Sequence, residues 1–231
     1  MNGCQLVIFD PPVYPPSMSR SPRAPGGTAE RLLDAAEAVF AERGYDAASL
    51  GDIADRVGVR PQAIYNHFRG KWELYEAVLE RLLDPFLALL EDAARTPEGG
   101  SRSGAAIARD IAYHARNPNL ARIVQYATLA GGEQLELLRA RWYRPFFERA
   151  LLLAPEKNAI VQKNPALLPW VISGFHALIL GYATLAPLNR ELLAIDPFSP
   201  EGVARQTEFL QELLALLNRE PSRAQAGSID A

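Results

Sequence analysis

The sequence has very little cysteine: Cys4 is the one thiol among 231 residues. A single cysteine excludes an internal disulfide framework and any metal site built from several cysteines. It fits a reducing compartment, so we expect a cytoplasmic protein. The N-terminal stretch lacks the basic start and the long apolar run of a signal peptide. Because its prolines and glycines oppose helix formation, we expect residues 1–27 to be mostly disordered, with Met18 as an alternative start to Met1.

An uninterrupted apolar run of membrane-spanning length is also missing. The most apolar segment, around residues 167–188, is interrupted at Trp170, Ser173, Gly174, His176, Gly181 and Tyr182. We therefore expect no transmembrane helix and no membrane partner.

Signatures of catalysis are absent as well. The sequence has no Gly-x-Ser-x-Gly nucleophile elbow, no phosphate-binding glycine loop and no His-Glu-x-x-His zinc motif. Its three histidines, His67, His114 and His176, show no i, i+4 pairing, so a metal site at His114 and His176 would need help from carboxylates. We expect neither an enzyme nor a bound cofactor or metal.

The chain has no excess of positive charge, since its formal net charge is −3. This argues against a generally basic nucleic-acid binder, so any contact with DNA must come from the placement of charges. Between residues 28 and 81 the acidic side chains fall largely in or beside the first predicted helix. The basic side chains gather from Arg56 to Lys71, where they can neutralise phosphates.

Apolar spacing predicts helices and no strands. The first helix covers residues 28–43, with Thr28 available as its N-cap and Gly44 as its stop. A short second helix begins at Ser49 and Asp52, whose spacing is that of a capping box with aspartate in place of glutamate.

A glycine-containing turn joins this second helix to a third. Gly58 ends the second helix, and Pro61 suits the first position of a third that runs to about His67. A fourth helix runs from Lys71 to about Leu90. Two short helices joined in this way are typical of a helix-turn-helix, although a purely structural corner between helices has the same pattern.

The rest of the chain is predicted to be helical and punctuated by prolines. Pro145 is expected to kink a long helix after Arg144, and the tail from residue 219 to 231 is expected to be disordered. The overall prediction is an all-α protein of about nine helices, the later ones lying near residues 103–117, 119–130, 132–153, 165–188 and 200–218.

Residues 28–74 resemble the DNA-binding domain of the TetR family of bacterial transcriptional regulators. The matches occur in order and at family spacing over TAERLLDAAEAVFAERGYDAASLGDIADRVGVRPQAIYNHFRGKWEL, at Ala35, Phe40, Gly44, Tyr45, Ile53, Ala54, Gly58, Val59, Tyr65, Phe68, Lys71 and Leu74. The resemblance implies a two-fold dimer with a helix-turn-helix domain at 28–74 and a helical ligand-binding and dimerisation domain at 75–218. Departures at Ala48, Gly51 and Arg60 leave the operator sequence open.

The third helix would then enter the major groove of DNA with its N-terminal residues nearest the base edges. Arg60, Gln62 and Asn66 are candidates for reading bases or, for Arg60, for binding phosphate. Tyr65 and His67 are expected to bind phosphates, as such residues do in the family. Ser49 and Lys71 each start a helix, where exposed N–H groups attract phosphate, and the ammonium of Lys71 adds charge.

The C-terminal half offers candidate residues for a dimer interface and for a ligand pocket. A stripe of small residues and an apolar face on the last helix predict an interface at Gly174, Ala177, Gly181, Leu210, Leu213, Leu214 and Leu217. Aromatic and polar side chains predict an apolar or aromatic ligand near Tyr113, His114, Tyr126, Trp142, Phe146, Trp170, Phe175 and His176. Burial within one subunit and plain core packing are the respective alternatives.

The sequence thus predicts a dimeric, ligand-responsive transcriptional regulator, most simply a repressor. It would bind a palindromic double-stranded DNA operator and be released by a small-molecule effector. The alternative is a helical module that binds small molecules or proteins and does not contact DNA.

Overall fold

The computed structural model describes residues 27–94, 102–153 and 159–218. The expectations for Cys4, for the start at Met18 and for the tail from residue 219 lie outside these residues. Within them the chain forms eleven α-helices and no strand, so the all-α class is confirmed. The count differs from the nine expected because two predicted long helices in the C-terminal half are each divided, a short helix was missed and the third predicted helix is not an α-helix.

The first helix, α1 (Thr28–Ala47), begins one residue after Gly27, which caps it without a side-chain hydrogen bond. The predicted capping role of Thr28 is therefore wrong, because Thr28 already lies inside the helix. Gly44 interrupts α1 with φ 72° and ψ 173°, a conformation that is essentially restricted to glycine. The predicted stop at Gly44 is thus confirmed, and the residues after it form a separate final turn.

The second helix, α2 (Leu50–Val57), begins with a complete capping box. The Ser49 hydroxyl accepts a hydrogen bond from the Asp52 N–H at 3.1 Å, and the Asp52 carboxylate accepts one from the Ser49 N–H at 3.1 Å. These hydrogen bonds from Ser49 lower the pKa of Asp52. Gly58 ends α2 in the left-handed conformation, with φ 73° and ψ 36°.

The third predicted helix is a 3-10 helix, η1 (Pro61–Asn66), which the α-helical pattern did not anticipate. It leads into α3 (Lys71–Ala94), a 24-residue helix that continues through Pro85. The later turns of α3 are joined to the following bundle by Asp84, which accepts a hydrogen bond from Trp142 Nε1 at 2.7 Å. Ion pairs from Arg141 to Glu80 and from Arg149 to Glu91 connect the same two segments.

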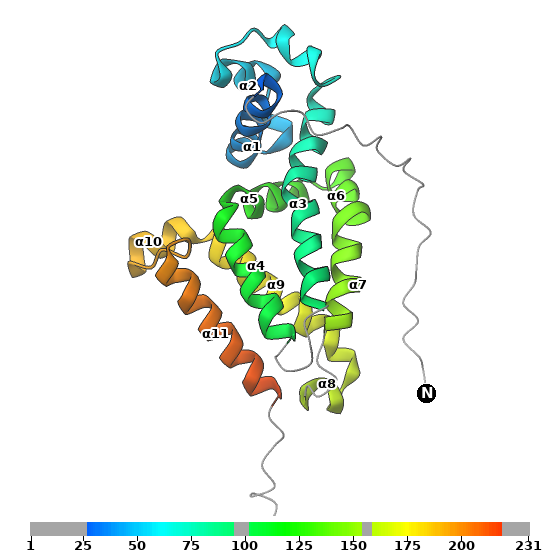
Figure 1. Ribbon diagram of the computed structural model, residues 1–231, viewed down its shortest axis with the longest axis vertical. Coiled ribbons are helices and arrows are strands. Elements are labelled where there is room, and N and C mark those ends of the chain that lie inside the picture. The colour runs from blue at the N-terminus through cyan, green and yellow to red at the C-terminus, as the bar shows by residue number, and fades with distance from the viewer. Residues whose placement is uncertain (1–26, 95–101, 154–158, 219–231) are drawn as a thin grey trace, which may run out of the picture.

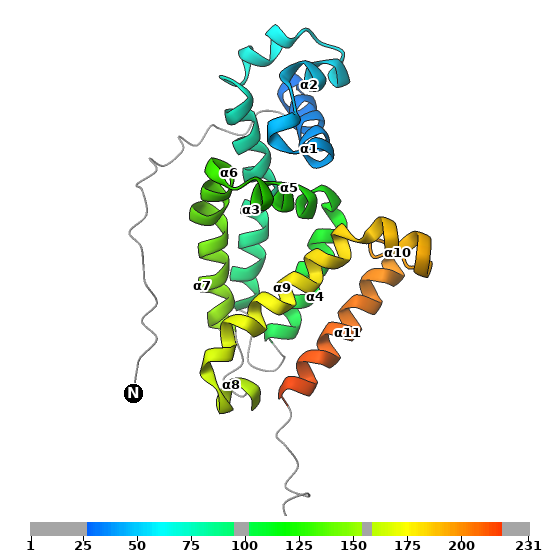
Figure 2. The same ribbon diagram turned by 180° about the vertical axis from the view of Figure 1, so that it is seen from behind.

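The remaining helices build the lower part of an elongated molecule (Figures 1 and 2). The helices α1, α2 and η1 lie at one end, α3 runs down from them beside α7, and α9 crosses the bundle diagonally with α11 outside it. Their bounds are α4 Arg102–Arg116, α5 Pro118–Ala130, α6 Gly132–Leu138, η2 Arg139–Tyr143, α7 Arg144–Leu153, α8 Ala159–Lys163, η3 Pro165–Leu167, α9 Leu168–Thr184, α10 Ala186–Leu193 and α11 Pro200–Asn218.

The long helix expected over residues 132–153 is irregular next to Pro145, as predicted. The segment η2 is a π-helical stretch that separates α6 from α7. Proline lacks an N–H group and its ring clashes with the preceding turn, so a widened turn before Pro145 relieves the conflict.

One continuous hydrophobic core connects the two ends of the molecule, from Leu32 in α1 to Phe146 in α7. The domain boundary predicted after residue 74 falls inside α3, so no helix end marks it. A second, smaller core joins α4, α9 and α11 and contains Ile107, Ile111, Ile179, Leu210 and Leu214. The predicted interface residues Leu210 and Leu214 are therefore buried within the single chain, which was the alternative interpretation.

Much of α9 is not covered by the described part of the chain. The stretch Pro165–Thr184 is long and apolar enough to cross a membrane by length and composition alone, and 17% of its most apolar window is buried. The sequence expectation concerned an uninterrupted apolar run, whereas this stretch qualifies by its average composition because its interruptions are uncharged. Trp170 near the start of α9 is 76% exposed.

Candidate nucleic-acid interface

The segment η1 is fixed to the core by one face. Ile64 is fully buried, and Phe68, which follows η1, is nearly so. The turn before η1 is held by a hydrogen bond of 3.0 Å from the Val59 N–H to the Ala54 carbonyl. Anchored in this way, η1 presents its opposite face to solvent.

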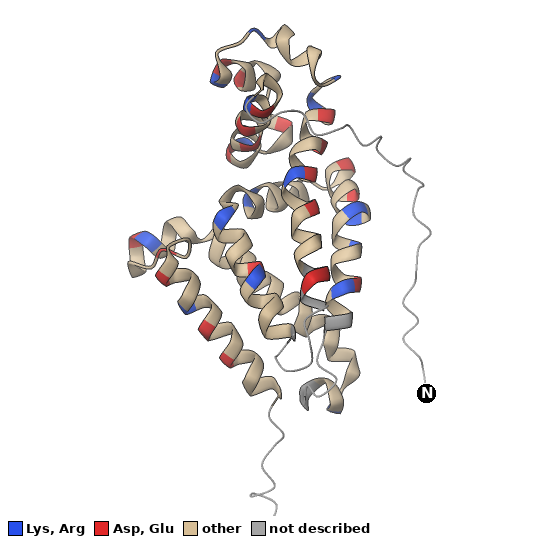
Figure 3. Ribbon diagram, viewed as in Figure 1, with Lys and Arg blue, Asp and Glu red and all other residues tan. Residues whose placement is uncertain are grey.

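Four polar side chains occupy this solvent face: Arg60, Gln62, Tyr65 and Asn66. Tyr65 is 52% exposed, so it is not part of the core. Within the described residues none of the four side chains makes a hydrogen bond or an ion pair. Figure 3 shows that the ribbon between α2 and α3 carries basic colour only at its two ends. The face therefore offers unused donors and acceptors without negative charge.

The neighbouring basic side chains are mostly paired. Arg43 contacts Asp52 at 2.8 Å, Arg56 pairs with Glu42, and Arg69 contacts Glu73 at 3.2 Å. Arg60 differs from them, because no carboxylate of the described chain pairs with its guanidinium. Its charge is available to an external anion.

Lys71 makes hydrogen bonds to the end of α1 that the sequence analysis did not predict. Its Nζ donates to the carbonyl oxygens of Tyr45 at 2.8 Å and Ala48 at 2.9 Å, and a longer contact of 3.4 Å reaches Asp46. The ammonium also lies 4.3 Å from the centre of the Tyr45 ring. Lys71 therefore caps the last turn of α1 and fastens the start of α3 to it, and the predicted phosphate contact by its ammonium stays a prediction.

Ser49 and His67 are also engaged within the chain. The Ser49 hydroxyl donates to the Asp52 carboxylate at 2.6 Å, so both its hydroxyl and its N–H serve the capping box. The His67 ring is half-buried and its centre lies 6.4 Å from that of Phe68. The structure thus concentrates the candidate DNA contacts on Arg60, Gln62, Tyr65 and Asn66.

Tyr126 joins the two ends of the molecule instead of lining a pocket. Its hydroxyl donates to the Glu42 carbonyl at 3.1 Å, and its ring lies against Gly44 of α1. Gln134 supports the same contact by donating to Asp46 Oδ1 at 2.9 Å. The sequence did not reveal this contact between α5 and α1, because it joins residues more than eighty positions apart.

Four of the predicted ligand residues, Tyr113, His114, Phe146 and His176, come together inside the bundle as buried side chains. The ring centres of Phe146 and His176 lie 4.6 Å apart, and Tyr113 donates its hydroxyl to the Leu82 carbonyl at 2.6 Å. Trp142 is almost fully buried nearby, and its indole N–H donates a hydrogen bond to Asp84 of α3. These rings pack against one another, as the core-packing alternative described.

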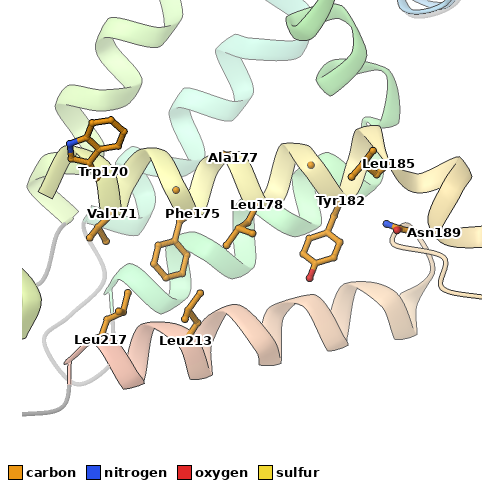
Figure 4. A pocket seen from close by; sticks show the side chains of 12 residues that line it. Trp170, Val171, Phe175, Ala177, Leu178, Tyr182, Leu185, Asn189, Leu213 and Leu217 are labelled. Atoms are coloured by element: carbon orange, nitrogen blue, oxygen red, sulfur yellow. The ribbon is translucent and has the colours of Figure 1, made fainter. Parts of the chain in front are cut away.

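The two other predicted ligand residues, Trp170 and Phe175, line a groove between α9 and α11 (Figure 4). The groove has a volume of about 560 Å³ and is walled almost entirely by apolar side chains, with Tyr182 and Asn189 toward one end. Five predicted interface residues also line it: Gly174, Ala177, Gly181, Leu213 and Leu217. The predicted pocket and the predicted dimer interface therefore meet on one surface.

A sequence profile described as "Bacterial regulatory proteins, tetR family" matches residues 32–78, which contain α2, η1 and the adjoining parts of α1 and α3. Residues 32–78 therefore resemble the N-terminal domain of TetR-family regulators. The same part of the chain is similar in sequence to named regulators. The "HTH-type transcriptional activator FasR" of Mycolicibacterium smegmatis is 48% identical over 66 residues, which are 29% of this chain and 30% of FasR. The "HTH-type transcriptional repressor KstR2" of the same species is 38% identical over 64 residues, which are 28% of this chain and 31% of KstR2.

Solved structures of TetR-like proteins match most of the fold. The ketosteroid transcriptional regulator KstR2 of Mycobacterium tuberculosis has a TM-score of 0.63 at 19% identity, covering 84% of this chain and 97% of that one. A bacterial regulatory protein of the tetR family from Rhodococcus RHA1 gives 0.61 at 18% identity, covering 84% and 98%. At these identities the match establishes the fold, while the sequence matches span about 30% of the length of FasR and KstR2.

Proposed function

We propose that the chain is a dimeric, cytoplasmic transcriptional regulator that binds a palindromic operator through η1 and is released by a small apolar or aromatic effector. The observation that carries the proposal is the solvent face of η1. Arg60, Gln62, Tyr65 and Asn66 are exposed there and make no side-chain hydrogen bond or ion pair with the residues that the structure describes, while Ile64 holds the same segment in the core. The relatives differ in their regulatory role, because FasR is named an activator and KstR2 a repressor. We assign a repressor by analogy with KstR2.

The four side chains suit the two kinds of contact that DNA requires. A glutamine or asparagine can pair with adenine through two hydrogen bonds, and arginine can do the same with guanine or bind a phosphate. The tyrosine hydroxyl can donate to a phosphate and adds no charge. One segment reads few bases, so a two-fold pair spaced by one helical turn of DNA, about 34–36 Å or a multiple, would supply the specificity.

The proposed dimer interface is the exposed face of α9 and α11. Nothing lies within 4 Å of a Cβ built on Gly174 or Gly181, so another helix can approach closely there. Exposed Trp170 belongs to the same apolar surface. An apolar surface of this kind on a single chain marks a site of association, and a second copy would cover it in a four-helix arrangement.

The proposed effector site lies on the inner side of α9, among the rings of Tyr113, His114, Phe146 and His176. An effector that enters there must separate rings that pack together, and it would thereby shift α9. Release from DNA requires that the effector bind better to the conformation that does not fit the operator.

DNA binding is tested by selecting sequences from a random duplex pool and measuring affinity against salt concentration. Arg60→Ala should weaken binding, and if each Arg60 binds one phosphate, the log–log salt slope of the dimer should fall by about 0.9 per contact, or about 1.8 in all. Arg205→Ala is the matched control, because Arg205 is exposed on α11 and pairs with Glu208. No enrichment of any DNA by the wild-type chain would favour the alternative, a helical binding module that does not contact DNA.

The dimer is tested with a pair of exposed leucines. Leu178 lines the groove and Leu129 protrudes from the end of α5. Leu178→Glu should produce monomers in sedimentation velocity, because it places a charge in the proposed interface, whereas Leu129→Glu should leave the dimer intact. A wild-type chain that sediments as a monomer at working concentration refutes this part of the proposal.

A further inference from the structure

Three titratable side chains meet inside the bundle where α4 and α9 touch. Asp110 and His114 lie one turn apart on α4, and His176 faces them from α9. His114 Nδ1 is 2.8 Å from Asp110 Oδ1, and His176 Nδ1 is 4.0 Å from Asp110 Oδ2. All three side chains are more than nine-tenths buried.

The surroundings of this cluster are aromatic and apolar. Phe86 of α3 packs edge-on against His114, and Phe146 of α7 lies against His176. Tyr143 of η2 places its hydroxyl 3.2 Å from His176 Nε2. The charges that act on Asp110 come from the two imidazoles, and the charge that acts on His114 comes from Asp110. Burial raises the pKa of Tyr143 above its ordinary value of 10, so this hydroxyl stays neutral.

The helix α9 has few other attachments. Its buried side chains are His176, Ile179 and Ala183, while most of its length faces outward. His176 Nδ1 has no hydrogen-bond partner within the described residues, although it is buried. One of three buried residues that hold α9 therefore belongs to a charged cluster with incomplete hydrogen bonding.

We propose that Asp110, His114 and His176 form a proton-sensitive latch that holds α9 against α4 and opens when the cluster loses a proton. With His114 protonated, the buried carboxylate of Asp110 is neutralised by an adjacent imidazolium. Loss of that proton leaves a buried negative charge among aromatic rings, and such a charge is strongly unfavourable without a partner. Separation of α9 from α4 would then admit water to the carboxylate.

The direction of the pH dependence follows from the shifts. Burial alone would lower the pKa of His114, but the charge of Asp110 and hydrogen bonds to it raise the pKa above 6.5. Burial alone would raise the pKa of Asp110, but the two histidines lower it to about 2. The stabilisation is therefore complete below pH 6.5 and is lost as the pH rises through the raised pKa of His114. Asp110 remains ionised throughout this range.

The latch is tested by the accessibility of a cysteine placed under α9. In the full chain carrying Cys4→Ser, Ala183→Cys introduces a buried thiol on α9, and Ala130→Cys introduces an exposed control thiol at the end of α5. Dividing one labelling rate by the other cancels the pH effect that is common to both thiols. We expect the ratio to rise several-fold between pH 6.5 and about pH 9.5, which is about one unit below the ordinary pKa of lysine.

The variant His114→Gln keeps a hydrogen-bond donor beside Asp110 but removes the titrating group. Its ratio should be raised at pH 6.5 and independent of pH. A flat ratio in the otherwise wild-type chain, or an equal rise in His114→Gln, would overturn the latch.

A second measurement follows the imidazoles directly. The chain has three histidines, so their imidazole NMR signals can be followed against pH and assigned with His67→Gln and His114→Gln. The His114 signal should show an imidazole that is still protonated above pH 6.5. A His114 imidazole that titrates at or below pH 6.5 would overturn the proposal. The effect of the latch on dimerisation rests on the proposed function, but both measurements read α9 and His114 directly and stand or fall independently of DNA binding.

Discussion

Replacing Gly44 by alanine tests how α1 is joined to α5. With φ 72° and ψ 173°, the backbone at Gly44 lies in a region that costs other residues about 1–3 kcal/mol. A Cβ at this position would also lie 3.0 Å from Tyr126 Cδ1 and 3.2 Å from its Cγ. Overpacking of this kind costs about 1–3 kcal/mol. We therefore expect Gly44→Ala to lower the free energy of unfolding by about 2–6 kcal/mol.

The matched control is Gly58→Ala. Gly58 also has a positive φ of 73°, but nothing lies within 4 Å of a Cβ built there. Its substitution should cost about 1–2 kcal/mol for the left-handed backbone alone. Urea unfolding at fixed protein concentration provides both values, because dimerisation would otherwise change the apparent stability.

A double-mutant cycle separates the steric part of the effect from the backbone part. In a Tyr126→Ala background the clash is gone, so Gly44→Ala should be less destabilising by about 1–3 kcal/mol. If Gly44→Ala is no more harmful than Gly58→Ala, or if the cycle shows no coupling, the described contact between α1 and α5 is not formed in solution.

Two further substitutions test the ends of the helices at the DNA-binding end. Lys71→Met should destabilise the fold by about 1.5–3 kcal/mol, the value of a hydrogen bond to a charged group, because the Tyr45 and Ala48 carbonyls lose their donor. Lys163→Met on α8 is the control in thermal unfolding, and equal losses would show that Lys71 does not cap α1. Asp52→Asn should remove a stabilisation that is present above pH 3.8 and lost as the pH falls through the lowered pKa of Asp52. Acid unfolding followed by circular dichroism should therefore depend less on pH in this variant, and an unchanged profile would contradict the capping box.

The DNA-binding end was largely predictable because its signals are local. The Ser49 and Asp52 pair, Gly44 and Gly58 each act within one or two turns, and all three features are present in the structure. The exposure of Tyr65 followed from a resemblance that extends over the same short stretch. The role of Lys71 was missed because its acceptors lie more than twenty residues earlier, where only the folded chain brings them near.

The C-terminal half was predictable as helices but not as a site. Proline punctuation located most helix ends, yet aromatic composition could not say which rings share a space. In the structure Tyr126 contacts α1, Trp170 and Phe175 line the groove between α9 and α11, and His176 lies beside the buried carboxylate of Asp110. Asp110, which organises that cluster, gave no sequence signal, because a lone aspartate on an amphipathic helix resembles any solvated residue.

The continuity of α3 has a mechanical consequence. Lys71 at one end is fastened to α1, and Glu91 near the other is ion-paired with Arg149 of α7. At 1.5 Å per residue these positions are about 30 Å apart along the helix axis. Pivoting the rod by ~5° at its far end would carry its near end sideways by ~2.6 Å, a displacement comparable with the ~3.4 Å rise of one base pair. If both subunits of a dimer rotated in this way, the distance between their two η1 segments would change by more than the rise of one base pair.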